Sequence, residues 1–224
     1  MKKAMLLFLS LVFILGVFAG CEKKTPTEPD ATAPTIPAPQ FSSPSATDTS
    51  QCNQMAYIYV QMANSMSLYG TIFTGQTPQQ NGDTWTWQFT QGTLTMRVVA
   101  TKQSSGGYQW QVILNGTDSQ DGTTYNNWVA LQGTSSADGK SGSWTIYEDN
   151  STVTAAQFLW ETSSAGVLTG TFTVYEQGVQ SYRVVVVRNA NGSGTVTHSI
   201  FSSGQWMTQF TANWAAQGAV AQCG

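Results

Sequence analysis

Hydrophobic and polar residues alternate with a period of two along most of the chain from Asn81 onward. In the segment TWTWQFT, for example, threonine and glutamine alternate with Trp85, Trp87 and Phe89. Successive side chains of a β-strand point to opposite faces of a sheet, so this period is typical of strands with one buried, aromatic face. The pattern predicts about ten strands, at residues 83–90, 93–102, 107–115, 126–136, 141–148, 152–162, 167–176, 180–189, 194–202 and 205–214.

Short turns separate the predicted strands. Pairs such as Asp138-Gly139 and Asn191-Gly192 lie between the alternating segments, and Gly, Asn and Asp tolerate the positive φ angles of tight hairpins. Parallel neighbours would need crossover connections of about a dozen residues or more, for which the spacing leaves no room. We therefore expect an antiparallel meander.

Part of the strand pattern is repeated. The segment GSWTIYE (142–148) matches GTFTVYE (170–176) at an offset of 28 residues. This offset is the length of a hairpin with its turns, so the repeat unit is expected to be a hairpin. Its glycine is expected to let a strand bend or to let a large ring pack over the backbone.

A long meander has two exposed edges, and closure into a barrel removes them. With its aromatic face inward and its Thr/Gln face outward, the pattern resembles the up-and-down β-barrels of the calycin (lipocalin) type, although the Gly-x-Trp motif near their first strand has no equivalent at that place. The expected fold class is all-β, with a closed or nearly closed up-and-down barrel. Two alternatives stay open: an open, twisted sheet covered by a helix, and an outer-membrane barrel with its aromatic side chains facing lipid.

Residues 53–68 carry the one helical pattern. Met55, Tyr59, the adjacent pair Met62 and Ala63, and Met66 recur at spacings of three and four residues, which predicts an apolar stripe on one face of a helix. We expect this helix to pack on the sheet or to plug the barrel, with its methionines in the core. Methionine also lines adaptable binding surfaces, which is the alternative for this stripe.

The N-terminus has the organisation of an export signal. Two lysines precede residues 4–19, which are apolar except for a serine and a glycine. This run is at the short end for a transmembrane helix, and a basic start followed by a short apolar segment is typical of a secretory signal peptide.

The apolar run ends in FAGC (18–21), which resembles the lipobox of bacterial lipoproteins: a bulky apolar residue and two small residues before a cysteine. The resemblance implies that residues 1–20 are removed and that Cys21 becomes a diacylglycerol-modified N-terminus; an uncleaved anchor is the alternative. Two acyl chains attach a protein firmly without spanning the bilayer. The expected location is the bacterial cell envelope, and because Glu22 rather than Asp follows the cysteine, the outer membrane (periplasmic face or cell surface) is favoured over the inner membrane.

Residues 22–50 contain six of the seven prolines, together with many Thr, Ser and Ala residues. Such a segment buries too little apolar surface to order itself. We therefore expect residues 21–50 to comprise the lipidated cysteine and a disordered tether, with a single domain at 51–224. A loosely packed arm of the domain is the alternative for the proline-rich segment.

The composition and charge of this domain argue against a nucleic-acid-binding function. Charged residues make up only 9% of the chain, far below the usual quarter, so solubility is expected to come from neutral polar groups. From Gln51 to Gly224, five Lys or Arg and eight Asp or Glu residues leave a net charge of −3. We therefore expect no nucleic-acid partner, because no basic patch is available to bind one.

Cys52 and Cys223 bracket the domain. In an oxidising compartment they are expected to form a disulfide; two free thiols are the alternative. The disulfide would make the first and last elements of the domain neighbours, as closure of a sheet into a ring would require.

Patterns for catalysis and metal binding are weak. His198, the only histidine, lies in a predicted strand and is expected to be exposed or hydrogen-bonded there. Without a free cysteine, neither a Cys–His pair nor a zinc site is supported, and no metal or cofactor is predicted. Glu148 and Glu176 would suit a glycan-acting hydrolase if they were paired, but we expect them at the solvated rim. Asp118 and Asp121 are expected in a polar hairpin loop, because the spacing of a calcium loop is missing.

All eight tryptophans lie in the domain. The leading hypothesis is a non-catalytic binding module that holds an apolar or aromatic small molecule against Trp110, Trp144 and Phe172. The alternative is a structural or interaction lipoprotein with a solid core and a working outer surface of Thr, Gln and Asn. An enzyme acting on glycans is the third hypothesis. The membrane is the expected partner through Cys21, and the oligomeric state is left open.

Overall fold

The computed structural model describes residues 32–45, 49–65, 76–218 and 221–224. Helix α2 (Gln51–Ser65) precedes the strands, and a 3₁₀ turn, η2 (Ala216–Gly218), lies near the end. The strands are β1 (Gln79–Asn81), β2 (Thr84–Gln91), β3 (Leu94–Lys102), β4 (Tyr108–Thr117), β5 (Thr124–Ser135), β6 (Ser141–Tyr147), β7 (Thr154–Thr162), β8 (Leu168–Glu176), β9 (Val179–Arg188), β10 (Gly194–Ser202), β11 (Gln205–Trp214) and β12 (Gln222–Cys223).

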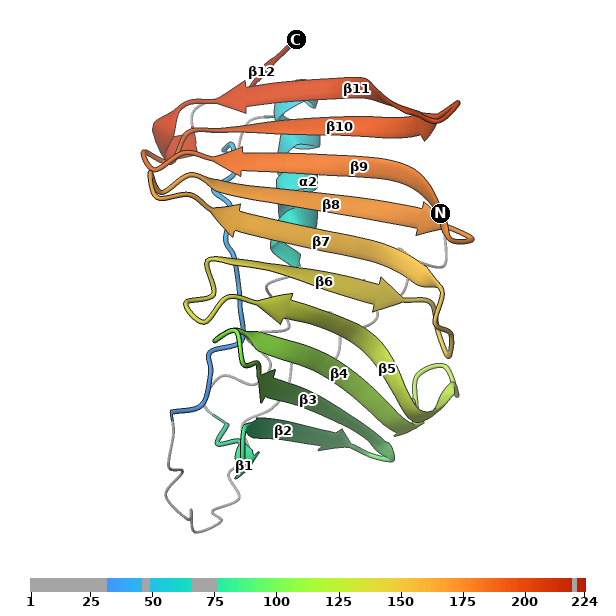
Figure 1. Ribbon diagram of the computed structural model, residues 1–224. Helices are drawn as coiled ribbons and strands as arrows, with labels where there is room; N and C mark the ends of the chain where they lie inside the picture. Colours follow the sequence, from blue (N-terminus) through green and yellow to red (C-terminus); the bar gives the residue numbers. More distant parts are fainter. Residues whose placement is uncertain (1–31, 46–48, 66–75, 219–220) are drawn as a thin grey trace.

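The twelve strands form one sheet in which every strand pairs antiparallel with the next strand along the chain (Figure 1). The antiparallel meander is therefore confirmed. All ten predicted strands are present, with ends within two residues of those expected. The alternation and the turn residues were sufficient for this, whereas β1 and β12, with three and two residues, were too short to predict.

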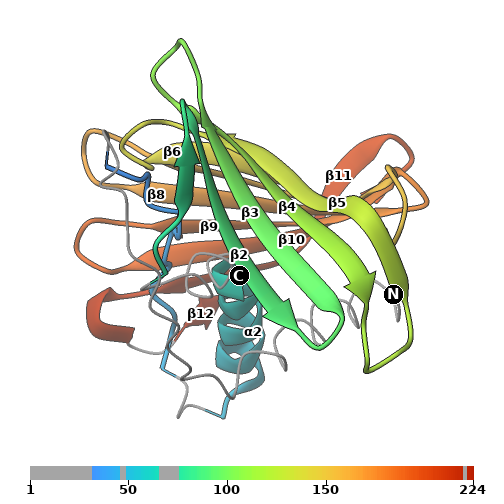
Figure 2. The ribbon, with the colours of Figure 1, turned by 90° about the horizontal axis from the view of Figure 1, so that it is seen from below.

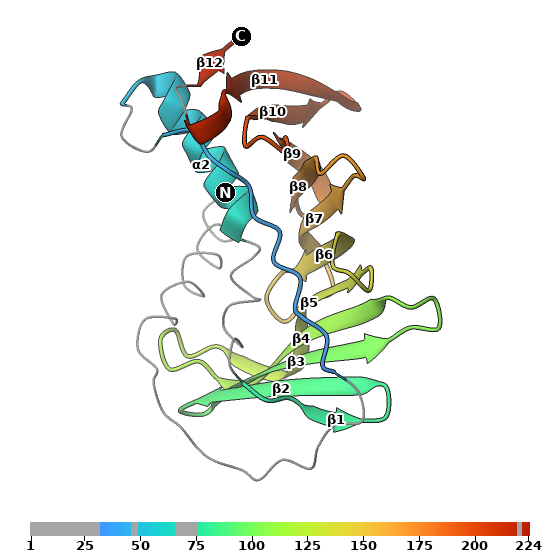
Figure 3. The ribbon, with the colours of Figure 1, turned by 90° about the vertical axis from the view of Figure 1, so that its left-hand side faces the viewer.

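The predicted closure into a barrel is not confirmed. β1 and β12 are the two edges of the sheet and do not pair with each other. The sheet is strongly curved, so that β1–β5 are turned relative to β6–β11, and α2 lies on the inner, concave side (Figures 2 and 3). An open, twisted sheet with a helix against one face describes the observed architecture.

Helix α2 crosses the concave side of strands β8–β12. The side chains that it buries are small or medium-sized, which lets the helix approach the sheet closely: Asn53, Ala56, Val60 and Ala63. Among the described residues of the predicted stripe, only Ala63 is fully buried; Met55, Tyr59 and Met62 flank the contact and are half-buried. The large side chains of this interface come from the sheet, so the helix packs through its small ones. Residues 66–68 of the predicted helix lie outside the described residues.

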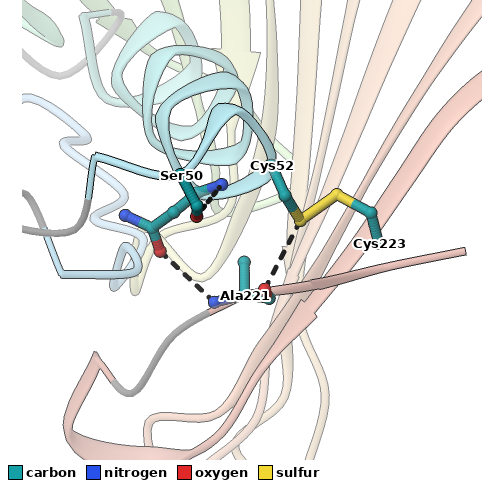
Figure 4. Close-up of a disulfide and its surroundings, with 5 residues drawn as sticks. Ser50, Cys52, Ala221 and Cys223 are labelled. Carbon is teal, nitrogen blue, oxygen red and sulfur yellow. Dashed lines mark hydrogen bonds between the residues drawn. A yellow bond between two sulfur atoms is a disulfide. The ribbon is translucent and has the colours of Figure 1, made fainter.

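The disulfide joins Cys52, in the first turn of α2, to Cys223 of β12, with Cα atoms 5.9 Å apart (Figure 4). The predicted pairing is thus present, but it ties a helix to the last strand rather than the first strand to the last. Asn53, which is fully buried, reinforces this junction. Its Oδ1 accepts a hydrogen bond from the amide of Ala221 at 3.2 Å, and its Nδ2 donates to the carbonyl of Ser45.

The proline-rich segment is not a free tether over its whole length. Residues 32–45 run as an extended arm on the same side of the sheet as α2 (Figure 3), and Ile36 and Phe41 are buried in the main core. Asn64 of α2 holds the backbone of Phe41 with two hydrogen bonds, of 2.7 and 3.0 Å. The expectation of disorder is therefore wrong for this part of residues 22–50, and the packed-arm alternative is correct there.

Candidate functional site

The concave face of the sheet carries the aromatic side chains predicted to face inward. Trp110, Trp144 and Phe172, the predicted ligand-binding residues, are 0%, 2% and 3% exposed. Trp110 lies between two other indoles, with ring centroids 6.1 Å from Trp87 and 6.2 Å from Trp144. These rings are packed against one another in the core, and the structure does not place them at an open surface.

The two glycines of the internal repeat each make room for an aromatic ring, that of Trp160 at Gly142 and that of Phe41 at Gly170. Trp160 of β7 is the register partner of Gly142 on β6 and of Gly170 on β8. A Cβ atom on Gly142 would lie 2.4 Å from the Trp160 ring, and one on Gly170 would lie 2.3 Å from Cζ of Phe41. The repeat therefore serves ring packing over the backbone, the second of the two roles expected for its glycines.

Three buried indole N–H groups on this side of the sheet have no acceptor in the described part of the chain: those of Trp85, Trp144 and Trp214. The indoles of Trp110, Trp128 and Trp160 do donate hydrogen bonds; that of Trp110, for example, donates to Ser135 Oγ at 2.9 Å. A buried donor without an acceptor costs about 1–3 kcal/mol. The concave face therefore gains free energy from any ligand or water that brings hydrogen-bond acceptors to these groups.

A second aromatic group lies where α2 meets β9–β11. It consists of Tyr59 on α2, Tyr182 on β9, His198 on β10 and Phe210 on β11, and we call it the His198 cluster. The imidazole of His198 stacks on the ring of Tyr59, with centroids 4.8 Å apart and an interplanar angle of 11°. Tyr182 lies 5.8 Å from His198, and Phe210 lies 5.8 Å from Tyr59.

Strand register explains why these side chains meet. His198 pairs with Val184 on β9 and with Phe210 on β11, and therefore points to the same side as the fully buried Val184. A β-bulge interrupts the β10–β11 ladder directly after His198. Bulges bend a strand and re-aim side chains, and they are common beside functional sites.

The His198 cluster is half-buried and carries no net charge of its own at neutral pH. Burial lowers the pKa of His198, which favours the neutral imidazole. Burial also raises the pKa of Tyr59, and burial, followed by Tyr59 and Glu176, raises that of Tyr182. Within the described residues, neither the imidazole nor the two phenols make a side-chain hydrogen bond. The cluster thus offers flat apolar rings together with unused donors and acceptors.

One side of the cluster is open to solvent. On β10 and β11, Ile200 pairs with Met207, and Ile200 also pairs with Tyr182 on β9. These side chains share the face of His198, and Met207 is 44% exposed. An incoming molecule would therefore meet an apolar edge before it reached the imidazole.

The carboxylates considered for catalysis lie at the rim. Glu148 is in the turn that connects β6 to β7, where its amide donates to the carbonyl of Val153. Glu176 ends β8 and is exposed. This agrees with the solvated positions expected for both residues.

Asp118 and Asp121 stabilise the loop that contains them. Each accepts a 2.8 Å hydrogen bond from the amide two residues further on, Gln120 and Thr123 respectively. Nearby, burial and then the charge of Asp121 raise the pKa of Asp149. This is the polar hairpin loop that the sequence predicted.

No three His, Cys, Asp or Glu side chains of the described residues are grouped so that they could bind a metal ion. No helix in this part of the chain combines the length and the apolar character that a bilayer crossing requires.

Comparison of the chain with profiles of known protein families, with curated protein sequences and with solved structures finds no match. The candidate site therefore rests on the chemistry of its own residues.

Sequence reasoning placed His198 in a strand, which is confirmed, but did not recognise its neighbours. The parity that it shares with Val196 was a usable signal that it points inward. Tyr59 was also singled out, as part of the helical stripe. That the two rings stack could not be predicted, because nothing local to either segment fixes where the helix crosses the sheet.

Proposed function

We propose that this protein is a lipid-anchored lipoprotein of the bacterial envelope whose β domain is a non-catalytic binding module for an apolar or aromatic small molecule. The observation that carries the proposal is the His198 cluster: a half-buried, neutral imidazole stacked on a tyrosine, with unused hydrogen-bonding atoms beside an exposed apolar edge. Small-molecule sites combine such apolar surfaces with a few polar groups that fix orientation.

The properties of the cluster indicate the class of ligand. Tyr59, Tyr182 and Phe210 offer ring faces and edges, which favour stacking and edge-to-face contacts with another aromatic ring. The polar groups are phenols and an imidazole rather than Lys or Arg, so a neutral ligand with a hydroxyl, carbonyl or amine group fits better than an anion. The unpaired N–H groups of Trp85, Trp144 and Trp214 lie deeper on the same concave side, inside the packed core.

The anchor belongs to the same proposal. If Cys21 carries two acyl chains, ten residues (22–31) separate it from the first described residue of the arm. At about 3.3–3.6 Å per residue, such a segment reaches at most about 36 Å. The domain would then be held close to the membrane, at the outer membrane in preference to the inner one.

Mass spectrometry of the intact protein from a bacterial membrane fraction tests the anchor. We expect a protein that begins at Cys21, with a mass increase equal to diacylglycerol or to a fully acylated cysteine. Cys21→Ser should abolish both the mass increase and the membrane association. An unmodified cysteine in a chain that still begins at Met1 would contradict the lipoprotein proposal.

The neutral fluorescent probe N-phenyl-1-naphthylamine tests the binding site. We expect its emission to rise on addition of the purified protein, and Tyr182→Ala or His198→Ala to weaken binding about tenfold, because each removes a ring contact worth about 1 kcal/mol together with a polar group. Native mass spectrometry of the protein as purified would show whether a ligand is retained.

Tyr147→Ala is the matched control for this experiment. Tyr147 is on the outer face of β6, where its hydroxyl is hydrogen-bonded to Gln132, so its removal should leave probe binding unchanged. Equal losses in Tyr147→Ala and Tyr182→Ala, or no probe uptake by the unmodified protein, would contradict the proposal.

The alternative, a structural or interaction lipoprotein, is favoured by the packing of the core. Trp110, Trp144 and Phe172 are buried against neighbouring side chains rather than lining an open space. In that case the outer surface would carry the function, and neither a retained ligand nor probe binding would be found.

A further inference from the structure

The outer, convex face of β7–β11 carries a row of polar side chains that lie side by side in register. The row crosses five strands and consists of Gln157, Thr173, Arg183, Ser199 and Thr208. All of its members except Arg183 are uncharged. It lies on the opposite face of the sheet from the His198 cluster, because Arg183 precedes the inward-facing Val184.

Arg183 is held in place on this face by an aromatic ring. Its guanidinium carbon lies 4.5 Å from the centroid of Trp206, a cation–π contact. Phe201 supports Trp206 from the side, with centroids 5.0 Å apart. The hydroxyl residues on either side of Arg183 are almost fully covered, with Thr173 6% and Ser199 3% exposed. The guanidinium is therefore positioned by packing before any partner arrives.

The charge of Arg183 has no partner in the described part of the chain. It forms no ion pair there, and its Nε is buried without an acceptor. Its terminal nitrogens are not among the buried, unpaired atoms, and the side chain is half-exposed. An arginine that is fixed, unpaired and accessible is poised to bind an anion.

We propose that Arg183 and Trp206 form a binding site for a carboxylate group of an acidic polysaccharide. A guanidinium presents its donors in one plane and so matches the two coplanar oxygens of a carboxylate. The same fork also accepts two oxygens of a phosphate; the uncharged groups beside Arg183 are what favour a carboxylate on a sugar chain. The hydroxyl of Thr208 and the amide NH₂ of Gln157, whose Oε1 already accepts a 2.7 Å hydrogen bond from the Tyr175 hydroxyl, suit the hydroxyl groups of a sugar chain.

Binding of the detergent-purified protein to immobilised polygalacturonate tests the proposal. Its methyl ester, which has the same backbone without the charge, is the matched neutral polymer. We expect binding to polygalacturonate, with at least tenfold weaker binding to the methyl ester. Arg183→Gln should weaken binding to polygalacturonate by about tenfold or more, because a hydrogen bond to a charged group contributes about 1.5–3 kcal/mol.

Arg97→Gln provides the matched control. Arg97 is an arginine of β3 that is already hydrogen-bonded, from Nη2 to Asn127 Oδ1 at 2.8 Å, and its replacement changes the net charge equally. We expect less than a twofold effect. Arg183→Lys keeps the charge but loses the planar fork, so its affinity should lie between those of the unmodified protein and Arg183→Gln.

Thermal unfolding of each variant separates loss of binding from loss of folding. A folded Arg183→Gln variant that binds polygalacturonate like the unmodified protein would overturn the proposal. So would equal losses in the Arg97 and Arg183 variants, which would indicate non-specific attraction. Tighter binding of a polyglutamate peptide than of polygalacturonate would also overturn the proposal, because it would indicate that the partner of the site is an acidic protein.

Discussion

Replacing Cys52 and Cys223 together by alanine is expected to lower the free energy of unfolding by about 3–5 kcal/mol. The two cysteines are 171 residues apart in the sequence, so their bond closes almost the entire domain into one loop. In the chain-entropy description a loop of this length gives about 5 kcal/mol, which is an upper figure. Denaturation in guanidinium chloride of the oxidised protein and of the double variant measures the difference.

The unmodified protein under reducing conditions is the control, and it should unfold at the same denaturant concentration as the double variant. The fold itself should survive, because Asn53 still ties α2 to Ala221 and Ser45 through buried hydrogen bonds. A loss below about 1 kcal/mol would contradict the expectation. It would mean that these contacts alone hold the helix to the last strand, or that the denatured chain retains structure.

The strands could be predicted from the sequence because their signals are local. Alternation marks each strand, and the turns contain residues that accept a positive φ, such as Asn150 at 50° and Gly178 at 78°. Each antiparallel pair then follows from chain order alone. Closure of the sheet is different, because it depends on how far the summed twist and curvature bring β1 towards β12. No single residue determines that outcome.

The helix shows a second limit of sequence reasoning. Large apolar residues defined the predicted stripe, but the sheet already supplies the large rings of the core, including Trp110 and Trp144. The helix therefore packs through Ala56, Val60 and Ala63, and its methionines lie at the margins. The burial of Asn53 could not be predicted, because its partners Ser45 and Ala221 come from opposite ends of the domain.

The candidate site was the least predictable part. The aromatic face was predicted correctly, but the ligand hypothesis rested on residues of that face that are deeply packed. His198 looked unremarkable because a lone histidine in a strand has no local partner. It becomes a candidate only where α2 crosses β10, a placement to which the disulfide and the contacts of the arm contribute. Arg183 likewise attracts attention only once Trp206 is seen beside it.

The position of the arm on the sheet can be tested with a pair of substitutions, each of which is expected to change stability strongly. Phe41 is 4% exposed, and its ring lies over Gly170 and edge-on to Phe158 at 6.4 Å. Phe41→Ala is expected to cost about 3–5 kcal/mol of stability, as for other buried phenylalanines. Gly170→Ala is expected to cost about 1–3 kcal/mol, because the added methyl group overlaps the ring.

The two substitutions should not add. The three heavy atoms nearest to a Cβ on Gly170 all belong to the ring of Phe41. In the Phe41→Ala background the added methyl group should therefore cost little, because it can fill part of the space left by the ring. We expect a coupling of at least about 1 kcal/mol, measured by denaturation of the four proteins in the cycle.

Gly142→Ala is the matched control, since Gly142 is the equivalent glycine of the internal repeat. Its Cβ would collide with Trp160 and with the carbonyl oxygen of Thr134, at 2.4 Å in each case, and neither contact involves the arm. Its cost should therefore be nearly the same with Phe41 or with alanine at position 41. If Gly170→Ala behaved like Gly142→Ala in this respect, the ring of Phe41 would not lie on β8. Residues 32–45 would then belong to the tether rather than to the folded domain, which would begin at the helix, as the composition of the sequence suggested.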